Sequence, residues 1–308
     1  MNTPKAVAKI IMQIYHTMYL ALRGESCLYV NGAIHINTEN LSFSEHNFGD
    51  DVNLPLVEAL TGLKAIPYKF TFGTRSKDVF LVIGSIIEDY SLPNAVIWGA
   101  GLIDIPSRKI TPPRKVCAVR GPLTRAELLK QGIACPEVYG DPAILLPAIY
   151  RPAVSKKYRL GIIPHVADKK LPVLQQLIQT LPPGDVTLID MEKYGHWRLL
   201  LDRLCECEAI VSSSLHGVVL ADAYQIPNRW VEFSDNVTGA GFKFRDYYAG
   251  SGRSIMSPMH IKDTLPSYHE LITAAATWEQ PRFNSQALLA ACPLPLRHDL
   301  KLDFTPSA

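Results

Sequence analysis

Residues 209–227 read Ala209-Ile-Val-Ser-Ser-Ser-Leu-His-Gly-Val-Val-Leu-Ala-Asp-Ala-Tyr-Gln-Ile-Pro227. The apolar run Ala209–Val211 predicts a buried strand, the three serines a tight turn, and the residues from Leu215 to Tyr224 a helix. We expect Ser214 to cap this helix, with its hydroxyl accepting a backbone N–H of the first turn. The free N–H groups and the helix dipole then favour an anion, and phosphate suits such a site.

The turn also supplies the first candidate site residues. His216 lies in the first helical turn, where its imidazole can hydrogen-bond a phosphate or donate a proton. Gly217 lets a ligand or another backbone come close. The remaining candidate anion contacts are Ser212, Ser213, Ser214 and Leu215. A plain capped helix with a structural histidine is the alternative interpretation of the same residues.

Outward from this segment, short apolar strands alternate with helical patterns, which predicts an α/β fold with parallel sheets. In the first half we expect strands at 27–30, 79–83, 95–98 and 116–119, and helices at 51–63 and 123–131. After a linker at 150–157 we expect strands at 159–163, 186–189, 209–211 and 229–233, and helices at 171–180, 196–205 and 215–224. We therefore predict two Rossmann-like domains, 1–150 and 151–308, facing a cleft at the carboxyl ends of their strands.

Two further candidates follow strands of the first half. Arg120 ends the strand in Val116-Cys-Ala-Val-Arg-Gly-Pro-Leu-Thr-Arg125, and its guanidinium fork matches a carboxylate or a phosphate. Asp141 precedes Pro142, where it is either a turn or helix cap or a ligand contact. Trp98-Gly-Ala-Gly101 lacks the full dinucleotide fingerprint, so no NAD site is predicted.

The other candidates lie in short polar segments. Asn47-Phe-Gly-Asp-Asp-Val-Asn53 precedes a helix, and there Asn47 and Asp50 could hold sugar hydroxyls, whereas Asp50 could equally cap the helix. His165 follows the first strand of the second half and is expected at the edge of the cleft. Lys243 and Arg245, close to two tyrosines, suit either a surface loop or a lid over an anion.

Composition limits the partners. With 31 Lys+Arg against 29 Asp+Glu the net charge is +2, which gives no support for nucleic-acid binding. The six scattered cysteines lack the spacing of a zinc site, so we predict no metal and reduced thiols in a cytoplasmic protein. The first 20 residues lack the pattern of a secretion signal and predict an amphipathic helix. That helix either packs on the fold or lies on a membrane surface.

Six segments in this order resemble the polysaccharide pyruvyltransferase family, in particular its exopolysaccharide-type members. They are Asn47-Phe-Gly-Asp50, Val119-Arg-Gly-Pro-Leu-Thr124, Tyr139-Gly-Asp-Pro142, Ile163-Pro-His165, Ser212-Ser-Ser-Leu-His-Gly217 and Lys243-Phe-Arg-Asp-Tyr-Tyr248. The resemblance implies a fold like that of the GT-B type glycosyltransferases. It also implies an enzyme that moves the pyruvyl group of phosphoenolpyruvate onto a sugar as a cyclic ketal, with no other cofactor. Ser214 is a departure, because many members carry Arg-Leu-His at this point.

On this resemblance we expect phosphoenolpyruvate between the domains, with its phosphate at 212–217 and its carboxylate near Arg120. His216 is the expected acid and Asp50 the expected proton acceptor for the sugar, which is part of a polysaccharide or its lipid-linked precursor. Such an acceptor would suit a peripheral location at the inner face of the cytoplasmic membrane. Two alternatives remain open: a glycosyltransferase that uses a nucleotide sugar, and a non-catalytic glycan-binding or assembly protein.

Overall fold

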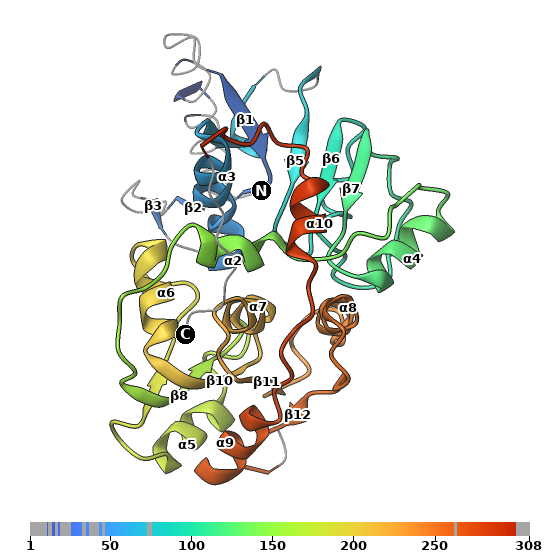
Figure 1. The fold of residues 1–308 in the computed structure, drawn as a ribbon. Coiled ribbons are helices and arrows are strands. Elements are labelled where there is room, and N and C mark those ends of the chain that lie inside the picture. The colour runs from blue at the N-terminus through green and yellow to red at the C-terminus, as the bar shows by residue number, and fades with distance from the viewer. Residues whose placement is uncertain are drawn as a thin grey trace.

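The computed structural model describes residues 11, 14, 15, 18, 26–32, 35–36, 43–44, 47–72, 76–261 and 264–299. It contains two sheets of five parallel strands, one in each half of the chain (Figure 1). The predicted α/β class with two parallel sheets is therefore confirmed. Most of the predicted helix at the N-terminus lies outside the described residues.

The first sheet has the order β4-β1-β5-β6-β7. Its strands are β1 (Cys27–Val30), β4 (Lys64–Pro67), β5 (Val79–Leu81), β6 (Ala95–Trp98) and β7 (Lys115–Ala118). A separate short hairpin pairs β2 (His35–Ile36) with β3 (Phe43–Ser44). The helical elements of this half are α2 (Phe48–Asp51), α3 (Asn53–Thr61), η1 (Tyr68–Phe70), α4 (Pro122–Lys130) and η3 (Pro142–Ala148).

The second sheet has the order β12-β11-β10-β8-β9. Its strands are β8 (Tyr158–Ile163), β9 (Val186–Leu188), β10 (Cys207–Ser212), β11 (Asn228–Glu232) and β12 (Met259–His260). Its helices are α5 (Pro172–Thr180), α6 (Trp197–Cys205), α7 (Leu215–Ala223), α8 (Phe242–Ser251), α9 (Tyr268–Ala276) and α10 (Ser285–Ala290). Numbered along the chain within each sheet, both sheets have the strand order 2-1-3-4-5, so each reverses direction next to its first strand.

Both sheets are buried on two faces, and successive strand residues point to opposite sides. In β6, Val96 and Trp98 belong to a large central hydrophobic cluster, whereas Ala95 and Ile97 belong to a cluster on the outer face. The central cluster also takes in Leu215 and its neighbours on α7, so it joins the two halves. In Figure 1, α2, α7 and α8 lie between the two sheets.

The C-terminal residues return to the first half. The indole of Trp98 donates to the carbonyl of Leu288 in α10 at 2.8 Å, and the amide of Arg297 donates to the carbonyl of Leu60 at 3.0 Å. In Figure 1 the red helix α10 lies beside the first sheet. The expected domain boundary at residue 150 stays a prediction, because α8 and α10 pack on the first half although they follow the second sheet.

Most predicted elements are confirmed within two residues, with three differences. The predicted helix 51–63 begins earlier and breaks at Val52 into α2 and α3. Its cap is Asn47, whose side chain accepts from the amide of Gly49, so Asp50 is not the cap. The strands β2, β3, β4 and β12 and the helices α8, α9 and α10 were not predicted, so the segment that carries Lys243 and Arg245 is a helix and not a surface loop.

Candidate functional site

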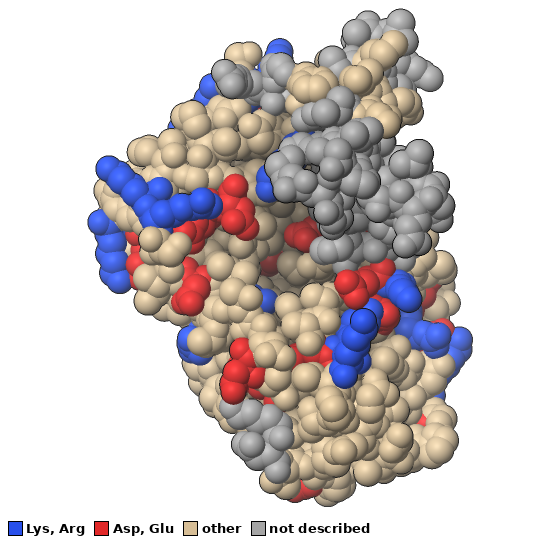
Figure 2. Space-filling view, turned by 180° about the vertical axis from the view of Figure 1, so that it is seen from behind, with Lys and Arg blue, Asp and Glu red and all other residues tan. Residues whose placement is uncertain are grey.

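A cavity of about 200 Å³ lies between the two halves, at the carboxyl ends of both sheets. This is where ligands of open α/β sheets bind. Both halves line it, with residues of α2, the loops after β5 and β8, the first turn of α7 and the start of α8. Figure 2 shows a hollow between the two halves, with Lys/Arg and Asp/Glu side chains beside it. The lining residues are Asn47, Asp50, Gly84, Ser85, Ile86, Asp89, Ile103, His165, Val166, Met191, Ser214, Leu215, His216 and Lys243.

The first turn of α7 points its N-terminus at this cavity. Ser214 is the N-cap by position, but its side chain makes no capping hydrogen bond, so the expected cap bond is wrong. Instead the hydroxyl of Ser212 accepts from the amide of Ser214 at 3.0 Å and lies 2.9 Å from the carbonyl of Ile163. Ser214 therefore lines the cavity, and its hydroxyl makes no capping hydrogen bond.

Ser212, Ser213 and Gly217 shape the turn from behind and do not line the cavity. A Cβ on Gly217 would lie 2.3 Å from the hydroxyl oxygen of Ser212, so only glycine fits there. Ser213 donates to the buried carboxylate of Asp168 at 2.6 Å and accepts from the amide of His165 at 2.8 Å. Ser213 therefore holds the loop that carries His165.

His165 and Lys243 add hydrogen-bond donors from the second half. The Nδ1 of His165 accepts from the amide of Ala167 at 3.2 Å, which leaves Nε2 as the N–H donor of a neutral ring. Burial, together with Lys243, lowers the pKa of His165 to about 4. Burial and the charge of Arg120 lower the pKa of Lys243 to about 8. Lys243 is 7% exposed, and no hydrogen bond joins its ammonium group to any residue that the structure describes.

His216 is the most confined side chain of the site. Its Nδ1 lies so close to Gly49 that a Cβ there would be 1.9 Å from the nitrogen. On the other edge of the ring, Nε2 is buried and stands 3.8 Å from Oδ2 of Asp141, beyond hydrogen-bond distance. Burial and then Lys243, Arg120 and His165 lower the pKa of His216 to about 3, so its imidazole is neutral in this state.

Arg120 is completely buried behind the cavity. Its Nε and Nη2 contact one carboxylate oxygen of Asp246 at 3.0 Å. Its Nη1 donates to the hydroxyl of Ser85 at 2.5 Å, and Nη2 also donates to the carbonyl of Leu102. A Cβ on Gly101 would lie 2.4 Å from Cζ of Arg120. The structure thus places Arg120 one side chain away from the cavity, with Ser85 between them.

The loop after β5 brings in residues that sequence analysis missed, chiefly Ser85. Two buried amides hold this loop: Asn31 accepts from the amide of Val82 at 2.7 Å, and Asn53 accepts from the amide of Ile83 at 2.8 Å. The available signal was the position of Gly84-Ser85 at the carboxyl end of a predicted strand. Asp89 and Met191 had no comparable signal, since each lies in an irregular loop.

Of the remaining predicted site residues, some line the cavity and others do not. Asn47 and Asp50 line the cavity from the first half, opposite Lys243. The guanidinium of Arg245 lies against Gly241, where a Cβ would be 2.8 Å from Nη1, and Arg245 does not line the cavity. Asp141 caps η3 by accepting from the amide of Ala143 at 3.0 Å, as the sequence pattern allowed.

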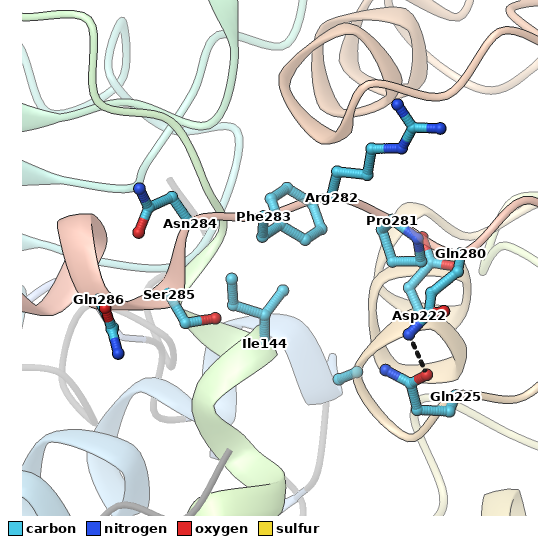
Figure 3. Close-up of a pocket in the computed structure, with 11 residues that line it drawn as sticks. Ile144, Asp222, Gln225, Gln280, Pro281, Arg282, Phe283, Asn284, Ser285 and Gln286 are labelled. Carbon is cyan, nitrogen blue, oxygen red and sulfur yellow. Dashed lines mark hydrogen bonds between the residues drawn. The ribbon is translucent and has the colours of Figure 1, made fainter. Parts of the chain in front are cut away.

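A second and larger cavity, of about 570 Å³, lies at the opposite end of α7 (Figure 3). Two of its three glutamines satisfy each other, since Gln280 donates to Gln225 at 2.8 Å. The carboxylate of Asp222, also in its lining, already accepts hydrogen bonds from Arg253 and from the indole of Trp278. None of the described residues that line this cavity combines a shifted pKa with a polar atom available to a ligand. We therefore place the functional site at the smaller cavity.

The described residues contain no group of three or more His, Cys, Asp and Glu side chains placed to hold a metal ion. In the same part of the chain, no helix is long and apolar enough to cross a bilayer. The expected absence of a cofactor stays a prediction.

The fold and the site define a class of protein: two-sheet α/β proteins in which a helix N-terminus, a lysine and two histidines meet in a cavity between the halves. Residues 47–235 match the sequence profile of the family described as polysaccharide pyruvyl transferase. The chain belongs to this family, which confirms the resemblance drawn from its motifs. Membership implies a transferase that acts on a polysaccharide.

Two curated proteins are similar over 215 residues. An uncharacterised protein, L143, of Acanthamoeba polyphaga mimivirus is 33% identical, over 67% of this chain and 71% of its own length. The succinoglycan biosynthesis protein ExoV of Rhizobium meliloti is 28% identical, over 66% of this chain and 61% of its own. The crystal structure of a functionally uncharacterised protein from Klebsiella pneumoniae aligns with 80% of this chain and 94% of its own at 14% identity, with a TM-score of 0.41.

The contact between Gly49 and His216 generates a first prediction. In Gly49→Ala the new methyl group would overlap the imidazole, so we expect the free energy of unfolding to fall by about 1–3 kcal/mol, as for an overpacked core. We also expect the NMR signals of the His216 ring to shift. Urea denaturation and imidazole NMR measure the two effects.

The control is Gly32→Ala, where the nearest atom to the new Cβ would be Cδ2 of Leu54 at an ordinary 3.6 Å. Its stability should stay within about 1 kcal/mol of the parent. A Gly49→Ala variant with parental stability and unchanged His216 signals would show that the ring does not need this glycine.

Proposed function

We propose that the protein transfers the pyruvyl group of phosphoenolpyruvate onto a sugar of a polysaccharide or its lipid-linked precursor, forming a pyruvate ketal. The observation that carries this proposal is the small cavity at the N-terminus of α7, with Lys243 and two histidines on one side and Asp50 with Asp89 on the other. Family membership supports the transfer of a pyruvyl group. The charge distribution supports an anionic donor next to a hydroxyl-bearing acceptor.

The donor phosphate suits the first turn of α7. The hydroxyl of Ser214, the backbone N–H groups of the turn and the ammonium of Lys243 offer donors to the same space. Nε2 of His165 adds an uncharged donor. Fixed donors in a largely buried site stabilise a phosphate strongly, because they need no reorientation when it binds.

The size of the cavity favours this donor over a nucleotide sugar. Drug-sized ligands occupy pockets of about 300–1,000 Å³, whereas this cavity holds about 200 Å³. A three-carbon phosphate is compatible with that volume, and a sugar linked to a nucleotide is not without opening of the halves. A GT-B type arrangement of the two domains remains part of the proposal, since two sheets face one cavity as it requires.

In the proposed reaction His216 gives a proton to the methylene carbon of the donor, whose double-bond electrons form the new C–H bond. The adjacent carbon becomes electron-poor, the two sugar oxygens bond to it, and its bond to the phosphate oxygen breaks. The diol supplies two protons, one that replaces the proton on His216 and one that leaves with phosphate. Asp50 accepts the first of them from a sugar hydroxyl.

We assign Arg120 an indirect part in donor binding. Asp246, Ser85 and Leu102 already accept its hydrogen bonds, so a direct contact with the donor carboxylate would require one of them to be displaced. Its charge acts across the hydroxyl of Ser85, which lines the cavity. Replacement of Arg120 should therefore weaken both the fold and donor binding.

The direct test mixes the protein with phosphoenolpyruvate and candidate glycans and measures released phosphate and a mass gain of one pyruvate ketal. We expect both products in equal amounts, and a fall in rate of about 10²–10⁴-fold in His216→Ala. Sugar transfer from a nucleotide sugar would favour the glycosyltransferase. Glycan binding without phosphate release would favour a non-catalytic role and contradict the proposal.

Lys243 sets the expected pH dependence. Its lowered pKa of about 8 means that the ammonium is charged below pH 8 and neutral above it. The donor phosphate stays dianionic over that range. The contribution of Lys243 to kcat/KM for phosphoenolpyruvate should therefore be near its full value at pH 7, fall to about half at pH 8 and fall by up to about tenfold per pH unit above that. In Lys243→Arg the fall should disappear, since a guanidinium keeps its charge; an identical profile would remove Lys243 from donor binding.

We further propose that the N-terminal segment contacts an anionic membrane surface, where a lipid-linked acceptor would lie. The helical residues Ile11, Ile14, Tyr15 and Met18 have the spacing of one helix face and are 47–57% exposed. The first 24 residues contain Lys5, Lys9 and Arg23 and no acidic residue. Apolar side chains on one face with basic residues nearby suit an interfacial helix.

Vesicle sedimentation tests this contact. The protein should bind vesicles that contain phosphatidylserine more than neutral ones, and Ile14→Asp with Met18→Asp should reduce the bound fraction at least about tenfold. The control is Ile105→Asp, which removes an apolar residue that is 64% exposed elsewhere on the surface. Equal binding by all three proteins would contradict a role for this segment.

A further inference from the structure

Two buried polar atoms face each other at the edge of the site without a hydrogen bond. Oδ2 of Asp141 and Nε2 of His216 are both inaccessible, and neither has a hydrogen-bond partner among the described residues. They stand 3.8 Å apart. Buried polar groups without partners are rare and costly, so such a pair calls for a functional explanation.

The two side chains are presented by elements that pack directly on each other. Asp141 precedes η3, His216 belongs to the first turn of α7, and η3 and α7 are in extended contact. The other oxygen of Asp141, Oδ1, accepts from the amide of Ala143 at 3.0 Å, which fixes the carboxylate and turns Oδ2 toward the imidazole. The carboxylate is only 1% exposed.

The imidazole has its second nitrogen on the opposite edge. Nδ1 lies against Gly49, between Asn47 and Asp50, which both line the cavity. His216 thus joins a buried carboxylate on one side to the ligand space on the other. A shift of less than an ångström in the ring would close the Nε2–Oδ2 gap, and such contacts are often long before a ligand binds.

We propose that Asp141 is a positioning residue that holds a proton on Nε2 of His216 and so directs Nδ1 to the substrate. The catalytic role of this arrangement rests on the proposed pyruvyl transfer. The interaction between Asp141 and His216 does not depend on which reaction the protein catalyses. When His216 is doubly protonated, the carboxylate of Asp141 stabilises the imidazolium. The proton then leaves from Nδ1, and the N–H on Nε2 stays in place.

The charges around His216 explain why the pair has this arrangement before the donor binds. The titratable groups that act on the imidazole are Asp141 from the start of η3, Lys243 from α8, Arg120 from the end of β7 and His165 from the loop after β8. Three of them are basic and disfavour an imidazolium. Burial raises the pKa of Asp141 to about 6. A phosphate next to Lys243 and His165 would offset the basic groups and let His216 accept a second proton.

The substitution Asp141→Asn removes the negative charge at this position but keeps the hydrogen bond that caps η3. The side-chain oxygen of asparagine can still accept from the amide of Ala143, which leaves its NH₂ group facing Nε2 of His216. An NH₂ group donates, so it should force the proton of the imidazole from Nε2 to Nδ1. The parent and the variant therefore predict opposite tautomers.

Nitrogen-15 NMR of the histidine rings reads the tautomer without any turnover. We expect Nε2–H in the parent protein, a higher pKa of His216 when inorganic phosphate is added, and Nδ1–H in Asp141→Asn. Asp202→Asn is the control: it alters a carboxylate of α6 that accepts from the hydroxyl of Tyr150, away from the site, and should leave the tautomer unchanged. Nδ1–H in the parent, or the same tautomer in parent and Asp141→Asn, overturns the proposal whatever reaction the enzyme catalyses.

Kinetics give a second readout. In Asp141→Asn we expect kcat for pyruvyl transfer to fall by about 10²–10⁴-fold while KM for phosphoenolpyruvate changes less than about threefold, since the donor contacts are untouched. A rise in KM for phosphoenolpyruvate as large as the expected fall in kcat, with kcat itself unchanged, would make Asp141 a donor contact and contradict the proposal. If the parent shows no pyruvyl transfer but the tautomers switch as expected, the proposed reaction fails and the Asp141–His216 pair stands.

Discussion

The close approach of the first turn of α7 to Gly49 is the contact on which the rest of the site depends. It brings a catalytic candidate from the second half against the backbone of the first, with no room for a side chain on Gly49. The surrounding structure is arranged around this contact. Asn47 caps the short helix that carries Gly49, and Asn53 joins that helix to the end of β5. Gly49 in the Asn47–Asp50 motif is therefore best explained by its contact with a histidine 167 positions later.

The buried ion pair between Arg120 and Asp246 also stabilises the packing of the two halves. Asp246 accepts hydrogen bonds from Arg120 and from both the amide and the hydroxyl of Thr124, so α8 of the second half is anchored to α4 of the first. Removing one partner of such a buried pair is strongly destabilising, because the other charge would remain without compensation. The cationic character of the cavity thus comes partly from an arginine that also holds the two halves together.

Much of the fold could be predicted because apolar strands between helices have a clear pattern. Four strands were missed. Two of them, β4 and β12, lie at sheet edges and have four and two residues, and the other two, β2 and β3, pair in a separate hairpin with two residues each. Strands of two to four residues are too short to show a clear alternation of apolar and polar residues, so their sequence carries a weak signal. The sequence also placed the N-cap of α7 correctly at Ser214 but predicted a capping hydrogen bond that its side chain does not make. Ser212 and Ser214 both offer a hydroxyl, and only the path of the turn selects the one that accepts the amide.

The sequence by itself determined the α/β class, the family and seven of the residues that line the cavity, because local patterns and ordered motifs carry that information. Tertiary structure decided the roles within the motifs: Ser213 faces Asp168, Arg120 faces Asp246, and Asp141 faces His216. Each of these pairs joins residues 45 to 126 positions apart. A local pattern can show that a residue is able to donate or accept, but only the packing of distant elements chooses its partner.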